Sequence, residues 1–281
     1  MKLGRRVLAL TLLLLLVLSG CGEKQAPAPE PTPEPVTAAS LLRDMNERLR
    51  EQGSATAEVQ AALSFTADNG GETMAFPLDM ALTLDMIFEP LQYHAAGSAG
   101  MAYMGMDMEL PLEVYARQQD GSLCTYVNVL DRWMRQSVET GEGSGLPALA
   151  GTGLSEEILA AAVLSEEPER VLDRDARRID LTVTGSMLQK ALSAVDSEAS
   201  AEMDRIDWDG VSVSCVFWID PETGLPVRQS IKTAAPIRSE GVSIDKLELL
   251  IDYTGFGCVS GITIPEEALN APDGDTLAKI M

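Results

Sequence analysis

Histidine is almost missing from this sequence of 281 residues, which contains only His94. A Ser-His-Asp triad needs a histidine, and multi-histidine metal sites need several, so this scarcity argues against most hydrolase and zinc-site arrangements. Basic residues are also few, because 21 Lys and Arg stand against 43 Asp and Glu, for a formal net charge of −22. Such an acidic chain repels phosphate backbones, which excludes nucleic acid as a partner. We therefore expect no enzymatic activity, no metal and no cofactor.

Cysteine is scarce as well, with four in the chain. Cys124, Cys215 and Cys258 do not have the spacing of a zinc or redox motif. Three thiols can form at most one disulfide, and the sequence leaves buried thiols and one bridge equally open. The methionine cluster at 101–108 has no Cys or His beside it, which argues against a copper site.

Long apolar runs are rare, and the one present stands at the N-terminus. Lys2, Arg5 and Arg6 precede the apolar stretch Val7 to Leu18, which is the layout of a signal peptide. Because a bilayer-spanning helix needs about 20 apolar residues, this stretch is too short for a transmembrane anchor. We expect residues 1–20 to be a signal peptide.

Cys21 follows this stretch directly, in the sequence Leu18-Ser19-Gly20-Cys21, which resembles the bacterial lipobox. In that motif a cysteine sulfur receives diacylglycerol before the signal is removed. The resemblance implies a mature lipoprotein that begins at Cys21 and is held on the extracytoplasmic face of the cell membrane by acyl chains such as palmitate. Two acyl chains anchor a protein firmly in a membrane, because each buried methylene adds about 0.8 kcal/mol to the free energy of membrane binding.

The mature chain would have 18 basic and 43 acidic residues, a formal net charge of −25. Anionic head groups repel such a protein, so a covalent tether is useful. Five prolines alternate with small or acidic residues just after Cys21. This composition prefers extended polyproline II, with a reach on the order of 40–50 Å. We interpret residues 21–38 as a spacer and residues 39–281 as one folded domain.

The domain opens with an amphipathic segment at 39–49, in which Leu42, Met45 and Leu49 share one face. Ser40 is the expected cap and Gly53 the expected stop of this helix.

Most of the remaining chain alternates apolar and polar residues with a period of two, which is typical of half-buried strands. The expected strands are 58–65, 78–89, 104–110, 112–119, 122–130, 177–183, 211–219, 225–233 and 244–253. Helices are expected at 156–164, capped by Ser155, and at 187–195. Long antiparallel strands with one apolar face predict an α+β fold with a curved antiparallel sheet wrapped over apolar material.

This order of elements resembles the half-barrel of the periplasmic lipoprotein carrier family (LolA-like) and of the mycobacterial LppX-like lipoproteins. The stretches that carry the resemblance are MAYMGMDMELPLEVYARQQDGSLCTYVN, DRWMRQSVE, FWIDPETGLPVRQSIKT and YTGFGCVSGITIPEEALN. The likeness is strongest to a group of Gram-positive lipoproteins. It implies a half-barrel with a few helices covering the concave face and a hydrophobic cavity for acyl chains.

The candidate cavity residues are the apolar members of the alternating strands: Leu78, Met80, Leu82, Leu84, Met86, Phe88, Met104, Met106, Met108, Phe217, Leu247, Leu249 and Ile251. Methionine suits a cavity that adapts to variable chains, because its thioether side chain is flexible. The same rows could instead fill an ordinary core. The leading hypothesis is a lipid-binding protein of the cell envelope, and the alternative is an interaction or sensory module that holds an envelope protein partner.

Overall fold

The computed structural model describes residues 36–69, 72–103, 106–139, 154–192, 206–239 and 242–272. The chain divides into the units Met1–Val36 and Thr37–Met281, and the fold below is that of the second unit. Its strands are β1 (Ser54–Asn69), β2 (Glu72–Ile87), β3 (Gln92–Tyr103), β4 (Met106–Gln119), β5 (Ser122–Val129), β6 (Arg132–Glu139), β7 (Ala162–Leu164), β8 (Glu169–Val171), β9 (Arg174–Thr184), β10 (Ser212–Ile219), β11 (Pro226–Thr233), β12 (Ile237–Ser239) and β13 (Val242–Phe256). Its helices are α2 (Ala38–Gln52), α4 (Glu156–Ala160), α5 (Gly185–Leu192), α7 (Glu266–Leu269) and the 3₁₀ turn η1 (Trp208–Gly210).

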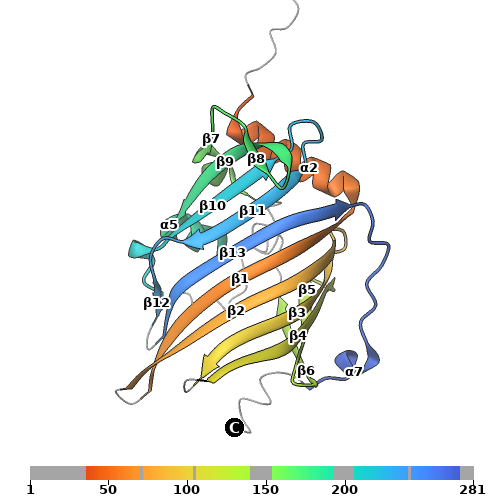
Figure 1. Ribbon diagram of the computed structural model, residues 1–281, viewed down its shortest axis with the longest axis vertical. Coiled ribbons are helices and arrows are strands. Elements are labelled where there is room, and N and C mark those ends of the chain that lie inside the picture. The colour runs from red at the N-terminus through yellow and green to blue at the C-terminus, as the bar shows by residue number, and fades with distance from the viewer. Residues whose placement is uncertain are drawn as a thin grey trace, which may run out of the picture. The chain divides into compact units, whose positions relative to one another are not determined.

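The strands form an antiparallel sheet in the order β6-β5-β4-β3-β2-β1-β13-β11-β10-β9-β7 (Figure 1). The sheet is not closed, because this path ends at β6 and β7. β12 pairs with β13, and β8 pairs with β9. The first and last long strands, β1 and β13, lie side by side near the middle of the sheet. The expected antiparallel α+β architecture with few helices is confirmed.

Strand register divides the side chains into two sets, because successive residues of a strand point to opposite sides. Leu82 of β2 lies opposite Val59 of β1. We call the side of the sheet that carries Leu82 and Val59 the apolar face. Their neighbours Ala81 and Gln60 also lie opposite each other, and we call their side the polar face.

Helix α2 confirms the expected opening helix, and Gly53 ends it with a φ of 73°. The cap differs from the prediction. The Thr37 side chain accepts from the Ser40 backbone N–H, and the Ser40 hydroxyl in turn accepts from the Thr37 backbone N–H. Ser40 is therefore the third helical residue of a capping box, because the two hydroxyl residues satisfy each other's backbone donors.

The main packed core lies beneath α2. Leu42, Met45 and Leu49 are buried there together with Ile179 of β9 and Phe217 of β10. Cross-strand neighbours on the apolar face supply the sheet side of this core, since Phe217 lies opposite Ile179. The filled core therefore occupies only one region of the apolar face.

The helix expected at 156–164 is wrong in its second half. Residues Glu156–Ala160 form α4, capped by Ser155, but Ala162–Leu164 form β7. Leu164 pairs with Ile179, so ladder hydrogen bonds to β9 outweigh the helical propensity of an alanine-rich segment. The helix expected at 187–195 begins earlier, as α5, and residues 193–195 lie outside the described residues.

The strand predictions at 104–110 and 112–119 merge into β4, which runs through Pro111. Pairing of β4 with β5 begins at Leu112, so the proline lies beyond the end of β5. A proline is tolerated in a strand where its missing N–H faces no partner. Strands β3 and β6 were not predicted. The three thiols of Cys124, Cys215 and Cys258 are not in disulfides.

Gly97 of β3 lies unusually close to its neighbour β2. A Cβ at this position would stand 2.0 Å from the carbonyl oxygen of Ala81 and 2.9 Å from the Cα of Leu82. Glycine inside a strand often marks such a close backbone approach. The pairing of β3 with β2 therefore needs glycine here.

Replacing Gly97 with alanine should lower the free energy of unfolding by about 2–3 kcal/mol, because backbone must move to admit the methyl group. Gly100→Ala is the matched control on the same strand, since its Cβ would meet its nearest atom at 3.7 Å. Urea denaturation measures both. Equal effects of the two substitutions would contradict the close approach at Gly97.

Candidate functional site

The apolar face carries a row of large side chains along β2 that is left half-buried. Leu78, Met80, Leu82, Leu84 and Met86 all keep part of their surface accessible. By contrast, the core residues beneath α2 are almost fully buried. The apolar face thus continues beyond the region that the packed core fills.

Strands β13 and β4 extend this half-buried surface on either side of β2. Leu247, Leu249 and Ile251 of β13 are half-buried, as is Met108 of β4. Met106 is exposed, at 60%. Three further residues of β4 on this face are also half-buried: Leu110, Leu112 and Val114.

Two predicted cavity residues belong to packed clusters, and a third is not among the described residues. Phe217 is 1% exposed and belongs to the packed core. Phe88 follows the end of β2 and packs against the core beneath α2 and against the smaller cluster around Tyr253. Met104 lies outside the described residues. Ten of the thirteen predicted residues therefore remain on the accessible part of the apolar face.

Sequence reasoning missed the small side chains that lie between the large rows. Ala57 and Ala61 of β1 are buried between the rows of β2 and β13, and Ala95 and Ala99 of β3 between those of β2 and β4. Alternating small and large residues is how strongly curved sheets fit side chains on their inner surface. The signal was present as alanine and glycine at every second position of β3, but it is too weakly apolar to stand out.

Two polar groups of the apolar face, the Tyr253 hydroxyl and the Cys215 thiol, are neutral. The Tyr253 hydroxyl donates to Oε1 of Gln229 at 3.4 Å, and both residues are buried. Burial raises the pKa of Tyr253 above its usual value. It also raises the pKa of the Cys215 thiol to about 11. These groups consequently stay uncharged at neutral pH and keep the surface compatible with apolar material.

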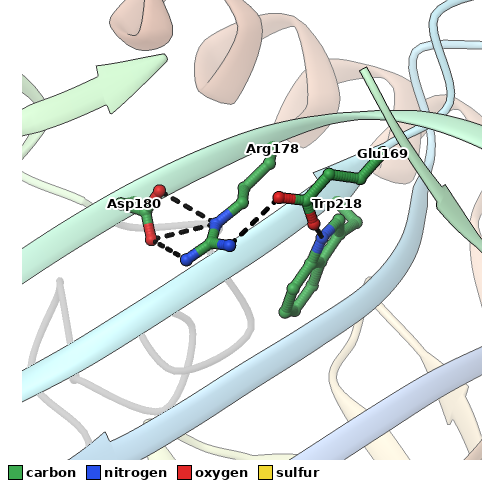
Figure 2. A network of polar contacts seen from close by, with 4 residues as sticks. All are labelled: Glu169, Arg178, Asp180 and Trp218. Atoms are coloured by element: carbon green, nitrogen blue, oxygen red, sulfur yellow. Dashed lines mark hydrogen bonds and ion pairs between the residues drawn. The ribbon is translucent and has the colours of Figure 1, made fainter. Parts of the chain in front are cut away.

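The polar face carries a network of four side chains that joins β8 to β9 and β10 (Figure 2). Nε1 of Trp218 donates to Glu169 at 2.8 Å, and Arg178 donates to the other oxygen of Glu169 at 3.0 Å. Arg178 also donates to Asp180 at 2.7 Å, and its guanidinium carbon lies 5.8 Å from the centre of the Trp218 ring. The hydrogen bonds from Trp218 and Arg178 lower the pKa of Glu169. The network fixes the indole against the sheet.

A depression of about 980 Å³ also lies on the polar face. Its wall includes residues of β1, β2, β3, β4, β10, β11 and β13, with Trp218 among them. Within the described ranges, no group of three or more His, Cys, Asp or Glu side chains could hold a metal ion. None of the described helices is both long and apolar enough to cross a bilayer.

The Trp218 network predicts a pH-dependent contribution of Glu169 to stability. Because its pKa is lowered in the folded state, the contribution is present above the ordinary carboxylate pKa and is lost as the pH falls through the folded-state pKa. The melting temperature of Glu169→Gln should lie below that of the wild type near pH 7, and the gap should narrow as the pH falls below the ordinary carboxylate pKa.

Glu167→Gln is the control for this prediction, because Glu167 is exposed in the same loop. Calorimetry at several pH values measures both. A gap between wild type and Glu169→Gln that stays constant with pH would contradict the hydrogen-bonded carboxylate.

The sequence matches no family model, and no curated protein matches it. Among solved structures it is similar to the lipoprotein LppX of Mycobacterium tuberculosis, at 14% identity and a TM-score of 0.40, covering 80% of this chain and 98% of that one. LprF from Mycobacterium bovis matches at 13% identity and a TM-score of 0.40, and the match covers 82% of this chain and 97% of LprF. A LolA superfamily protein from Nitrosomonas europaea matches at 13% identity and a TM-score of 0.21, and the match covers 83% of this chain and 97% of that protein. The proteins named by the sequence resemblance are thus among those found, and the proposals that follow rest on the residues of this chain.

Proposed function

We propose that this protein binds a hydrophobic ligand with acyl chains against the apolar face of its sheet. The observation that carries the proposal is the contrast between the core beneath α2, which is filled, and the rows of β2, β4 and β13, which stay half-buried. Fully burying one leucine is favourable by about 1.5–3 kcal/mol relative to exposing it. A ligand that completes the burial of several such residues therefore gains substantial binding free energy.

We also infer that the apolar face is the inner side of the curved sheet and that α2 covers one end of it. Figure 1 shows the bend of the sheet from β2 towards β6. The small residues of β1 and β3 support this inference, because bulky rows on every strand would resist bending towards that side. Contiguous apolar surface is rare on soluble proteins unless something binds to it.

Flexible hydrocarbon chains suit this surface better than a rigid ligand does. The β2 row consists of leucine and methionine, whose side chains offer no strong hydrogen-bonding groups. Methionine in particular adapts its shape to different ligands. The β2 row is therefore suited to a flexible apolar ligand that carries no polar groups where it contacts the row.

Binding rather than catalysis is part of the proposal. The only histidine lies on the polar face, where its Nε2 is 3.1 Å from Oε1 of Glu113 and its ring stacks on Tyr115 at 4.3 Å. This placement supports a structural role for His94. Tethering through Cys21, which lies outside the described residues, would hold the binding face at the extracytoplasmic side of a membrane.

Protein purified under mild conditions should carry lipid that organic solvent extracts and mass spectrometry identifies. Leu82→Asn places a polar amide in the apolar row and should reduce the bound lipid by about tenfold or more, because the leucine contact is lost and the amide must give up water. Thr83→Asn, on the opposite face of the same strand, should leave the lipid content unchanged.

Two results would contradict the lipid-binding proposal. One is a lipid-free extract from the wild-type protein. The other is a stable complex with an envelope protein that Leu82→Asn abolishes, which would favour the interaction module instead.

The tether predicts a specific effect of Cys21→Ser. Wild-type protein should incorporate an alkyne analogue of palmitate in growing cells and sediment with membranes, whereas Cys21→Ser should do neither. Cys258→Ser, which removes an exposed thiol elsewhere, is the control and should behave like the wild type. Equal labelling of Cys21→Ser and wild type would contradict lipidation at this cysteine.

A further inference from the structure

The depression is lined mainly by residues of the polar face, and Met80, Met108 and Leu249 of the apolar rows also border it. It has a volume of about 980 Å³ and reaches from Trp218 on β10 to Glu109 on β4. Strands lie about 4.8 Å apart, so the six steps from β10 to β4 span on the order of 30 Å. The depression is therefore long enough for an extended ligand of several units.

Its floor includes three uncharged polar side chains at matching register, with Leu250 and Ala81 between them. Ser230 of β11 lies opposite Leu250, which lies opposite Gln60 of β1. Gln60 lies opposite Ala81, which lies opposite Ser98 of β3. The line thus places two hydroxyls and one amide along the length of the depression.

Ser230 is the most buried polar residue of this line. It is 6% exposed and lines the depression. Its hydroxyl can both donate and accept a hydrogen bond, so it offers a polar contact to a ligand in the depression.

Trp218 forms one end of the depression as a fixed aromatic surface. Its N–H is held by Glu169, and Arg178 lies over its ring (Figure 2). An indole that is already ordered loses little conformational entropy when a ligand packs on it. The network therefore provides a preorganised stacking surface.

The charges in the depression disfavour anions and hydrocarbons. Arg228 donates to both oxygens of Asp252, at 2.5 and 2.7 Å, so its charge is neutralised within the wall. Lys232 is likewise paired, because its Nζ lies 3.8 Å from Oε1 of Glu248. At the far end, Asp79 and Glu109 are exposed. An anion would be repelled by these carboxylates, and an apolar ligand would have to desolvate the charged wall.

An extended peptide is also a poor fit. Strands such as β1 and β2 are paired on both sides, so their backbone groups are already used. A peptide could not gain the main-chain hydrogen bonds that strand addition provides.

We propose that the depression binds an uncharged oligosaccharide. Sugar hydroxyls both donate and accept, which matches the hydroxyls of Ser230 and Ser98, the amide of Gln60 and the accepting carboxylates of Asp79 and Glu109. The apolar side of a sugar ring packs on an aromatic face such as that of Trp218. Ser230 and Gln60 contact the ligand in the middle of the site, and Trp218 contacts it at one end.

Calorimetric titration with chitohexaose, cellohexaose and maltohexaose tests the proposal on the whole folded protein. At least one of the three should bind with a Kd below about 1 mM. Ser230→Ala and Gln60→Leu should each weaken that binding by about fivefold to tenfold while the melting temperature stays near that of the wild type. Thr182→Val, on the polar face of β9 outside the depression, is the matched control and should change nothing.

Three results would overturn the proposal: no binding of any of the three hexasaccharides, binding that Ser230→Ala and Gln60→Leu leave unchanged, or binding of hexalysine that Gln60→Leu abolishes. The lipid content of these variants, measured in parallel, should equal that of the wild type. Loss of sugar binding with lipid retained would separate this site from the one on the apolar face.

Discussion

The two-residue period of the long strands is the constraint on which the rest of the structure depends. In strands such as β1 and β2, each 16 residues long, every second side chain must point to the same side. Because these side chains are apolar along most of that length, the sheet has a continuous apolar surface. Helix α2 covers only the part of this surface that lies on β9 and β10. What remains is half-buried, and this incomplete burial is the physical basis of the proposal that a hydrophobic ligand binds there.

The same period gives the opposite side of the sheet a different chemistry. Ala81 and Thr83 alternate with Leu82 and Leu84, so each strand that contributes to the apolar rows also contributes to the polar depression. The two surfaces are therefore joined by a shared backbone, and Met80, Met108 and Leu249 of the apolar rows also border the depression. Pairing of β1 with β13 near the middle of the sheet connects chain segments from both ends of the folded unit.

Sequence patterns revealed the elements whose two faces differ strongly in polarity. In β2, leucine and methionine alternate with aspartate and threonine, and the strand, its face and its half-buried row could all be predicted. β3 was missed because its apolar positions are Ala95, Gly97 and Ala99, whose small side chains give little contrast. Their size is set by curvature and by the close approach of β2, which are tertiary effects. β7 was mistaken for helix because its pairing with β9 is not visible locally. The Trp218 network joins residues 49 positions apart in the sequence and could not be read from any local motif.

The central claim is that acyl chains lie against the apolar face, and photo-crosslinking tests it most directly. Purified protein loaded with a diazirine-bearing fatty acid would be irradiated and digested, and the modified residues identified by mass spectrometry. The account predicts adducts at the apolar-face positions of β2 and β13, such as Met80, Leu82 and Leu249, and none at Ala81 or Thr83. Adducts spread equally over both faces, or confined to the polar one, would contradict it.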